Sequence, residues 1–273
     1  MSVESVGTDS SERAEAAVVS RVLEWEGCYN VRDLGGLPTR DGRRVRWGAL
    51  VRSDIPTRLT AKGRRALVQH GISSIVDLRF SDEVTLDWDR YPFKGQGGGP
   101  AYSNVPFHEW GSTGPDETTI AAYRAAATRA ELIRLDLDLN RAGIGAAVAW
   151  IADAPAGGVL VHCHAGKDRT GIVVALILAV LGASDDDIAD DYALTAANIE
   201  PLIVEWLDET SDDPGERRRL RELAMPAREA MLDALDYLRS RYGAADDYLR
   251  GAGVTEAQLE RLSARLLGDE GSA

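Results

Sequence analysis

A cysteine and an arginine stand six positions apart in the second half of this chain, at Cys163 and Arg169. A cysteine is a nucleophile only as the thiolate, which forms more readily at a helix N-terminus and beside cations. The apolar run that ends at Val161 is typical of a buried strand, and residues 172–181 are typical of a buried helix. Because Lys167 and Arg169 lie in the turn between them, we expect the thiolate of Cys163 to be stabilised.

The loop between these two residues has the features of a phosphate site. Backbone N–H groups that curl toward one centre at a helix N-terminus bind phosphate, and Gly166 permits the left-handed backbone that such a curl needs. Arg169 adds planar donors that match phosphoryl oxygens, and the hydroxyl of Thr170 is placed to hydrogen-bond the sulfur. This pattern predicts phosphoryl transfer through phosphocysteine. The expected phosphate-binding residues are His164, Ala165, Gly166, Lys167, Asp168 and Arg169.

Other kinds of site match the sequence less well. A lone cysteine on a buried strand is usually an inert core residue, but the spacing to the arginine and the strand-to-helix position favour a functional one. A Walker loop needs glycine where Val161 stands and Ser or Thr where Asp168 follows Lys167. His162 and His164 flank the cysteine, but no second group of ligands lies nearby in the sequence. We therefore expect neither a metal nor a cofactor.

The segment from His162 to Thr170 resembles the signature of the cysteine-dependent protein tyrosine phosphatase superfamily. Together with four further motifs it is similar to the bacterial tyrosine/serine phosphatase group with Lys and Asp in the loop. Those motifs are NVRDLGG at 30–36, RSD at 52–54, VDLR at 76–79 and a C-terminal YGAADDYLRGAG. The similarity covers residues 24–267. It implies metal-independent hydrolysis of phosphotyrosine, in some members also of phosphoserine, phosphothreonine or phosphoinositides.

The leaving oxygen in such a reaction needs a proton from a carboxylic acid within hydrogen-bond reach. This chain lacks the Trp-Pro-Asp loop that carries the acid in many family members. The resemblance instead implies two candidates: first Asp168, the aspartate within the loop, and second Glu109, at a position where related enzymes usually have aspartate. We expect Asp54 and Asp82 to lie in turns or ion pairs.

Residues outside the loop are expected to support it. Asn30, Arg32 and Asp33 belong to one of the matching motifs, and we expect them to brace the loop through hydrogen bonds and an ion pair. Lys167 has two interpretations, a solvated side chain or a second contact to a phosphate or acidic group. Cys28 is expected to be structural.

The pattern along the chain predicts the α/β class, with a central mixed, largely parallel sheet flanked by helices and a helical C-terminal portion. Residues 72–78 are typical of a buried strand whose carboxyl end, where such sheets bind ligands, carries Arg79. Residues 28–36 and 45–52 are spaced like a hairpin, and residues 59–70 predict a helix capped by Thr60.

We expect a flexible segment at residues 1–20 and a single phosphatase domain at residues 21–273. This domain includes C-terminal helices within 185–267 and a candidate lid at 195–224. For the charged stretch 210–222 a solvated connection is favoured, and part of a lid is the alternative.

The 31 basic and 44 acidic residues give a net charge of −13, which disfavours nucleic acid and anionic membranes as partners. A phosphate site must therefore be a local basic pocket. The only two cysteines, Cys28 and Cys163, form no disulfide framework, and the first residues are polar and acidic. We expect a cytoplasmic bacterial protein without membrane insertion, and the sequence leaves its oligomeric state undetermined.

The combined expectation is a phosphomonoester hydrolase of protein tyrosine phosphatase type that uses Cys163, Arg169, Thr170 and either Asp168 or Glu109. Its partner is a phosphorylated protein. One alternative keeps the chemistry but acts on a small metabolite phosphate, such as a nucleotide, sugar or inositol phosphate. A more remote alternative is a phosphate-binding module without catalysis.

Overall fold

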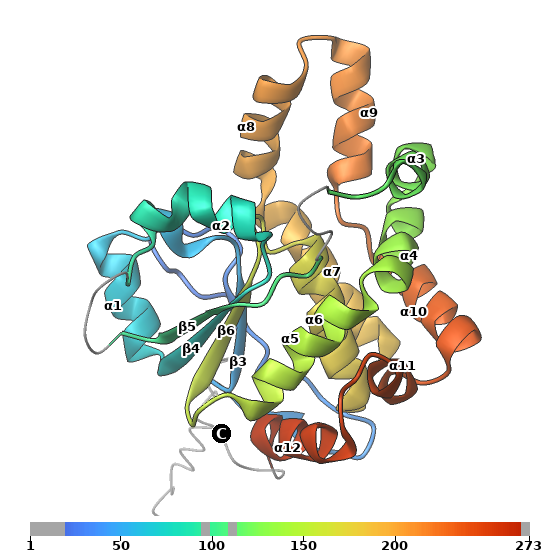
Figure 1. Cartoon of the computed structure of the whole chain (residues 1–273). Helices are drawn as coiled ribbons and strands as arrows, with labels where there is room; N and C mark the ends of the chain where they lie inside the picture. The colour runs from blue at the N-terminus through green and yellow to red at the C-terminus, as the bar shows by residue number, and fades with distance from the viewer. Residues whose placement is uncertain (1–19, 94–98, 109–113, 269–273) are drawn as a thin grey trace, which may run out of the picture.

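The computed structural model describes residues 20–93, 99–108 and 114–268 and has an α/β fold (Figure 1). Its main sheet has the strand order β1-β3-β6-β4-β5, in which β1 is antiparallel to β3 and the other neighbours are parallel. The strands are β1 Arg32–Asp33, β3 Leu50–Ser53, β4 Ile72–Asp77, β5 Ala101–Asn104 and β6 Gly158–His162. A second ladder pairs β2 Arg44–Val45 with β7 Leu267–Gly268. The predicted mixed, largely parallel sheet is confirmed.

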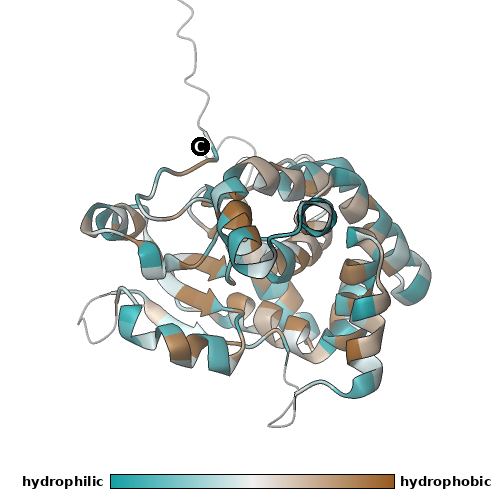
Figure 2. Ribbon diagram, turned by 90° about the horizontal axis from the view of Figure 1, so that it is seen from above, coloured by the Kyte–Doolittle hydropathy of each residue, from teal (hydrophilic) through white to brown (hydrophobic). Residues whose placement is uncertain are grey.

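The two faces of the sheet are covered unequally. Val159 and Val161 belong to the larger apolar cluster, whereas Leu160 between them belongs to a smaller one, as expected for strand side chains that alternate between faces. The larger cluster is built with seven helices: α4 Arg129–Leu139, α5 Arg141–Asp153, α6 Asp168–Val180, α7 Asp185–Asn198, α10 Arg228–Tyr242, α11 Ala245–Gly251 and α12 Glu256–Leu266. On the smaller side, α1 Ala61–Gln69 contributes Leu67. Figure 2 shows the strands mostly in brown at the centre, between helices with teal outer positions.

Parallel strands bring the carboxyl ends of β3, β4, β5 and β6 to one edge of the sheet. Cys163 directly follows β6, and Asp54 directly follows β3 at this edge. After β4 the chain turns into α2 Ser81–Asp87, where the carboxylate of Glu83 accepts a hydrogen bond from the backbone N–H of Phe80 at 2.9 Å. The 3-10 turns η1 Pro56–Arg58 and η2 Trp88–Arg90 complete this region.

Helices α8 Glu200–Thr210 and α9 Pro214–Ala224 form a hairpin that projects from the rest of the molecule (Figure 1). The prediction of a solvated connection at 210–222 is wrong, because α9 occupies most of it. Asp213 caps this helix by accepting a hydrogen bond from the N–H of Glu216 at 2.7 Å, and Pro214 occupies its first position. The charged side chains form an exposed helix face, on which Arg217 pairs with Asp208 at 2.6 Å.

Several local predictions can be compared with the structure directly. The strand at 72–78 and the helix at 59–70 are confirmed, and Thr60 caps α1 by accepting a hydrogen bond from the N–H of Gly63. The pairing of 28–36 with 45–52 is antiparallel as expected, with Arg32 opposite Arg52. A single strand at 45–52 is wrong, because a turn at Gly48, whose φ is +72°, separates β2 from β3.

The stretch from 118 to 153 contains α4, α5 and most of α3 Glu117–Ala125. Almost all of the predicted flexible segment 1–20 lies outside the described residues. Within the described ranges, no helix is both long enough and apolar enough to cross a bilayer.

Candidate active site

The loop after β6 is held close to the neighbouring strand β3. Cys163 at its start is 3% exposed, and Gly166 within it has a φ of +65°. A Cβ atom at Gly166 would lie 2.2 Å from the backbone oxygen of Ser53. Both the positive φ and this close approach require glycine.

Four carbonyl groups of the loop point outward to donors in the protein. The oxygen of His164 accepts from the N–H of Ile55 at 2.8 Å, and that of Lys167 accepts from the N–H of Gly171 at 2.8 Å. The side-chain amide of Asn30 donates to the oxygens of residues 165 and 166 at 3.0 and 3.2 Å. Arg52 also donates to the oxygen of residue 166 at 2.8 Å.

In a trans peptide the N–H points opposite to the C=O. Outward carbonyls at 164–167 therefore turn the following N–H groups, at 165–168, toward the inside of the loop. Within the described residues, the backbone N–H groups of 164–169 donate to no protein acceptor. Free N–H groups on a curled backbone at the N-terminus of α6 form an anion site.

Arg169 lies in the first turn of α6, and Glu83 of α2 binds its guanidinium group. Nη1 lies 2.5 Å from Oε2 of Glu83, and Nη2 lies 3.1 Å from Oε1. The guanidinium also lies over the ring of Phe80, 5.0 Å from its centroid. Nε has no hydrogen-bond acceptor within the described ranges, so it remains available to an anion. Burial disfavours the charged form, but Cys163 and Glu83 outweigh it and raise the pKa of Arg169.

Asp168 makes contacts that keep it ionised. Its carboxylate lies 3.2 Å from Nζ of Lys167 and 3.2 Å from Nη1 of Arg129, and it accepts a hydrogen bond from Tyr192 at 3.2 Å. Burial acts to raise the pKa of Asp168, but Lys167 and Arg129 outweigh it, so that the pKa lies below its usual range. A group that donates a proton must first hold one, so this geometry disfavours the first candidate for the acid.

Lys167 is 9% exposed, and its ammonium group donates to the backbone oxygen of Ala224 at 2.7 Å. The interpretation of Lys167 as a solvated side chain is therefore wrong. Ala224 is the last residue of α9, where helix carbonyl groups lack partners within the helix. Lys167 thus joins the loop to the base of the α8–α9 hairpin.

The structure places Thr170 next to Arg169, and its hydroxyl is fully buried. Within the described residues Oγ1 has no hydrogen-bond partner, so the expected bond to the sulfur is not formed. Glu109, the second candidate for the acid, lies outside the described residues. Its neighbour His108 is stacked on Phe80 with ring centroids 5.1 Å apart, and burial lowers the pKa of His108 to about 4.

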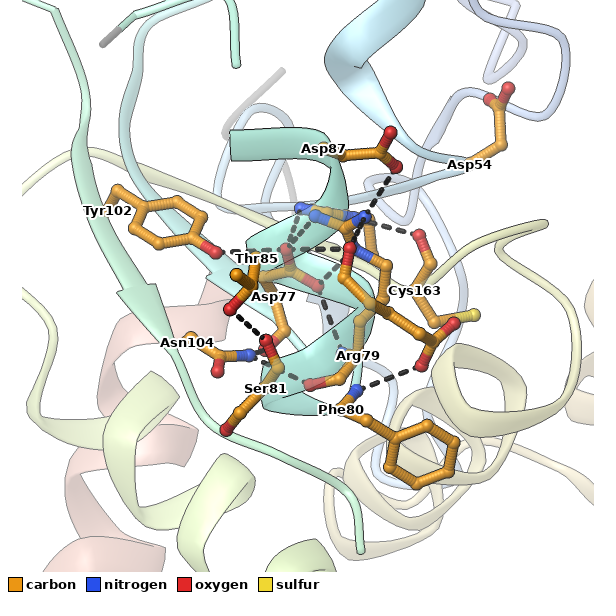
Figure 3. Close-up of polar contacts among 12 residues, drawn as sticks. Asp54, Asp77, Arg79, Phe80, Ser81, Thr85, Asp87, Tyr102, Asn104 and Cys163 are labelled. Carbon is orange, nitrogen blue, oxygen red and sulfur yellow. Dashed lines mark hydrogen bonds and ion pairs between the residues drawn. The ribbon is translucent and has the colours of Figure 1, made fainter. Parts of the chain in front are cut away.

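Arg79 connects β4 to α2 (Figure 3). Its guanidinium donates to Asp77 at 2.7 to 3.1 Å and to Asp87 at 3.0 Å, and Tyr102 donates to Asp77 at 3.0 Å. Cys163 lies beside this cluster in the same view. Because Arg79 also donates to the backbone oxygen of Glu83 at 3.4 Å, the cluster fixes the position of the carboxylate that holds Arg169.

The other aspartates considered in the sequence have plain roles. Asp54 is buried and accepts hydrogen bonds from the backbone N–H groups of Tyr29 and Asn30 at 3.1 and 3.0 Å. It therefore holds a turn, as expected, and burial raises the pKa of Asp54 to about 6. Asp82 is exposed on α2.

A cavity of about 480 Å³ lies between the loop and the α8–α9 hairpin. Three cations reach it: Arg58, Arg129 and Lys167. Its apolar lining is supplied by Leu132, Leu202, Ile203, Trp206, Leu220 and Leu223. Larger surface hollows of about 710 and 760 Å³ lie away from the loop. Two carboxylates, Glu205 and Glu209, also line the cavity beside the loop, so this cavity combines an apolar surface with charges of both signs.

Asp136 on α4 is a titratable group that belongs to none of the sequence motifs. Its carboxylate accepts hydrogen bonds from Tyr123 at 2.7 Å and Asn140 at 3.2 Å. Burial raises the pKa of Asp136 to about 7, and the charge of Asp168 adds to this. Burial and the approach of Asp168, which is distant in sequence, come only from the fold.

This raised pKa predicts a pH-dependent stability. An aspartate in an unfolded chain titrates near about pH 3.9, so the folded state binds the proton of Asp136 more tightly. The stability that protonated Asp136 contributes is complete below about pH 3.9 and is lost as the pH rises through about 7. Asp136→Asn should remove the loss, and its free energy of unfolding relative to wild type should rise by about 2–3 kcal/mol between pH 5 and pH 8. Urea unfolding at both pH values measures this, and parallel pH curves would contradict it.

Comparison with known proteins agrees with this geometry. The model of the tyrosine phosphatase family matches residues 23–268. The triple specificity protein phosphatase PtpB of Mycobacterium tuberculosis is 31% identical over 279 residues, which cover 90% of this chain and 99% of that protein. A tyrosine-protein phosphatase of Nostoc commune is 35% identical over 122 residues, which cover 42% and 41%. The crystal structure of P. aeruginosa TpbA aligns with 77% of this chain and 90% of its own at 16% identity, with a TM-score of 0.34.

The family model spans nearly the whole described chain, and the match to PtpB spans nearly the whole of both proteins. The chain therefore belongs to the tyrosine phosphatase family.

Proposed function

We propose that this enzyme hydrolyses phosphomonoesters, phosphotyrosine first among them, through a phosphocysteine formed on Cys163. The observation that carries the proposal is the loop itself. Its carbonyl groups are bonded to the protein, its N–H groups have no acceptor among the described residues, and Cys163 and Arg169 stand at its two ends. Such a loop supplies both a nucleophile and a holder for phosphoryl oxygens.

In the first step the thiolate sulfur of Cys163 attacks phosphorus in line with the ester oxygen. The S–P bond forms, the P–O bond to the leaving group breaks, and the leaving oxygen takes a proton from the acid. In the second step water attacks phosphorus and gives a proton to the carboxylate left by the first step, the S–P bond breaks, and phosphate and the thiolate are released. The loop N–H groups and Nε of Arg169 hold the non-bridging oxygens in both steps.

The acid is either Asp168 or Glu109. Lys167 and Arg129 lie 3.2 Å from the carboxylate of Asp168 and favour its ionised form. We therefore assign Asp168 to the anchoring of these cations and the proton transfer to Glu109.

The cavity beside the loop supports a substrate that pairs a phosphate with an apolar group. Trp206 and Leu202 supply apolar surface, which suits the ring of phosphotyrosine. PtpB is named for triple specificity, which makes phosphoserine, phosphothreonine and phosphoinositides worth testing as further substrates. The alternative substrate is a small metabolite phosphate, and the cations Arg58 and Arg129 at the cavity already pair with Glu205 and Asp168. Turnover of a metabolite phosphate panel beside phosphotyrosine peptides decides between the two substrate classes.

We also propose that the α8–α9 hairpin acts as wall and lid of the site, within the candidate lid at 195–224. It is tied to the core by Arg58, whose guanidinium lies 3.0 Å from the carboxylate of Glu205 on α8, and by Lys167 at the end of α9. The enzyme would work in a reducing cytoplasm, since Cys28 and Cys163 are both free and a nucleophilic thiolate oxidises readily.

Replacement of the nucleophile should separate binding from turnover. Cys163→Ser should lower kcat for p-nitrophenyl phosphate by at least about 1,000-fold, because the serine hydroxyl is not ionised, while tungstate still binds. Steady-state kinetics and calorimetry measure the two properties. Cys28→Ser is the matched control and should keep wild-type turnover, as should the wild type in EDTA. Turnover by Cys163→Ser near the wild-type rate would overturn the mechanism.

Removal of the negative charge on Glu83 should leave the guanidinium group of Arg169 less firmly held in position. Glu83→Gln loses one charge-assisted hydrogen bond, and we expect kcat/KM to fall by about tenfold. Asp82→Asn removes the same charge from the same turn of α2 and should leave kcat/KM unchanged, because Asp82 is exposed and does not pair with Arg169. Equal effects of both variants would mean that kcat/KM depends on the negative charge of α2 and not on the two hydrogen bonds between Glu83 and Arg169.

The two acid candidates should differ in the pH dependence of kcat. With an acid that must be protonated, the rate falls as the pH rises through its pKa. We expect Glu109→Gln to abolish this alkaline fall and Asp168→Asn to leave it in place. A profile of kcat from pH 5 to pH 9 for both variants tests the assignment, and loss of the fall in Asp168→Asn would return the role to Asp168.

A further inference from the structure

Three arginines converge on one carboxylate beneath the phosphate loop. Arg32 and Arg52 stand opposite each other on β1 and β3, and Arg21 precedes them in the chain. All three pair with Asp191 of α7. The side chains of Arg32, Arg52 and Asp191 are at most 1% exposed, so these three charges are sealed from water, whereas Arg21 is 21% exposed.

Arg52 bridges this cluster and the loop. Its Nη1 donates to Oδ2 of Asp191 at 2.7 Å, and its Nη2 donates to the backbone oxygen of Gly166 at 2.8 Å. Nε is buried and has no partner within the described residues. A buried guanidinium with an unused donor is costly, so its position against the loop calls for an explanation beyond packing.

Arg32 reaches the same loop indirectly. Its Nη1 donates to the side-chain oxygen of Asn30 at 2.6 Å, and the amide group of Asn30 donates to the oxygen of Ala165 at 3.0 Å. Thr195 and Asp191 take the other donors of Arg32. Two adjacent loop carbonyls are thus held by two arginines, one directly and one through an amide.

The cluster carries more positive than negative charge. Within the described ranges, Asp191 is the only carboxylate that pairs with Arg32 or Arg52. Three guanidinium groups against one carboxylate leave two positive charges below the loop, on the side away from an incoming phosphate. The field of the two buried arginines favours a bound oxyanion, whereas the charge of Arg21, which is 21% exposed, is screened by solvent.

We infer that Arg52, held in place by Asp191, is a positioning residue for the phosphatase reaction, which fixes the carbonyl of Gly166 outward and so aims the loop N–H groups at the phosphoryl group. The inference rests on the proposed function of the loop. Arg52 touches neither substrate nor sulfur in this scheme, and it acts through the backbone of Gly166.

The charge states of the cluster agree with this role. Burial and the neighbouring Arg32 lower the pKa of Arg52 to about 10, while Asp191 and Cys163 act in the opposite direction. Arg52 therefore stays charged through the neutral range. Burial acts to raise the pKa of Asp191, but Arg32, Arg52 and Arg21 outweigh it and lower that pKa well below its usual range.

Oxyanion binding without turnover tests this inference. In a Cys163→Ser background, the affinity for sodium tungstate is measured by calorimetry for Arg52→Met, Arg52→Lys and Asp191→Asn. We expect the affinity to fall by about 10- to 100-fold for Arg52→Met. Arg52→Lys should lose less, because lysine keeps the charge but cannot bridge Asp191 and Gly166 at once. The tungstate affinity of Asp191→Asn should lie between that of the Arg52 variants and that of the parent.

Arg21→Gln is the matched control, because Arg21 pairs with the same carboxylate but donates to no loop carbonyl. It should keep the parent's tungstate affinity within about twofold. Thermal unfolding with and without tungstate separates lost binding from lost folding, since the shift in Tm on adding the anion reports affinity alone.

Several results would overturn the inference: folded Arg52 variants with the parent's affinity, a loss in Arg21→Gln as large as in Arg52→Met, or failure of all three test variants to fold, which would assign the cluster to stability. The proposed function fails separately, if the wild-type enzyme has no phosphatase activity while tungstate binding still depends on Arg52. With an active wild type, kcat/KM of the Arg52 series in the presence of Cys163 should follow the order of tungstate affinity.

Discussion

An anion site made of backbone N–H groups requires that the opposite carbonyl groups point away from it and still find donors. This constraint shapes the structure around the loop. The N–H of Ile55 at the end of β3, the amide of Asn30 before β1 and the guanidinium of Arg52 in β3 meet it for His164, Ala165 and Gly166. The antiparallel β1 and the parallel β3 thus serve the loop, because together they bring donors beneath a segment that follows β6.

The same constraint explains how an acidic protein with a net charge of −13 can hold phosphate. The cations next to the loop pair with three carboxylates: Arg169 with Glu83, Lys167 and Arg129 with Asp168, and the buried arginines with Asp191. These carboxylates orient the cations and offset their burial, and in the part of the chain that the structure describes the loop N–H groups and Nε of Arg169 have no protein acceptor. The overall charge therefore says little about the site, whose field is set by pairs a few ångströms apart.

The parts of the site that the sequence predicts are those coded by local spacing. The strand, loop and helix around Cys163 depend on neighbouring residues, and so does the cap of α1 at Thr60. The partners Glu83, Arg52 and Asp191 could not be assigned, because each lies on another element and meets the loop only through the order of strands. Helix α9 was missed for a different reason: its cap at Asp213 and Pro214 lies in a charged stretch with little apolar periodicity. Asp136 has a raised pKa because the folded chain buries it and brings Asp168 near it.

The loop and the hairpin are coupled through shared cations. Lys167 and Arg129 both pair with Asp168 at the start of α6, and both donate to backbone oxygens at the end of α9, those of Ala224 and Leu223. A cation at the C-terminus of a helix stabilises that helix, as these two cations do for α9. An anion at the N-terminus of a helix stabilises it in the same way, as Asp168 does for α6. Lys167 and Arg129 therefore link the start of α6, where the phosphate loop ends, to the base of the α8–α9 hairpin.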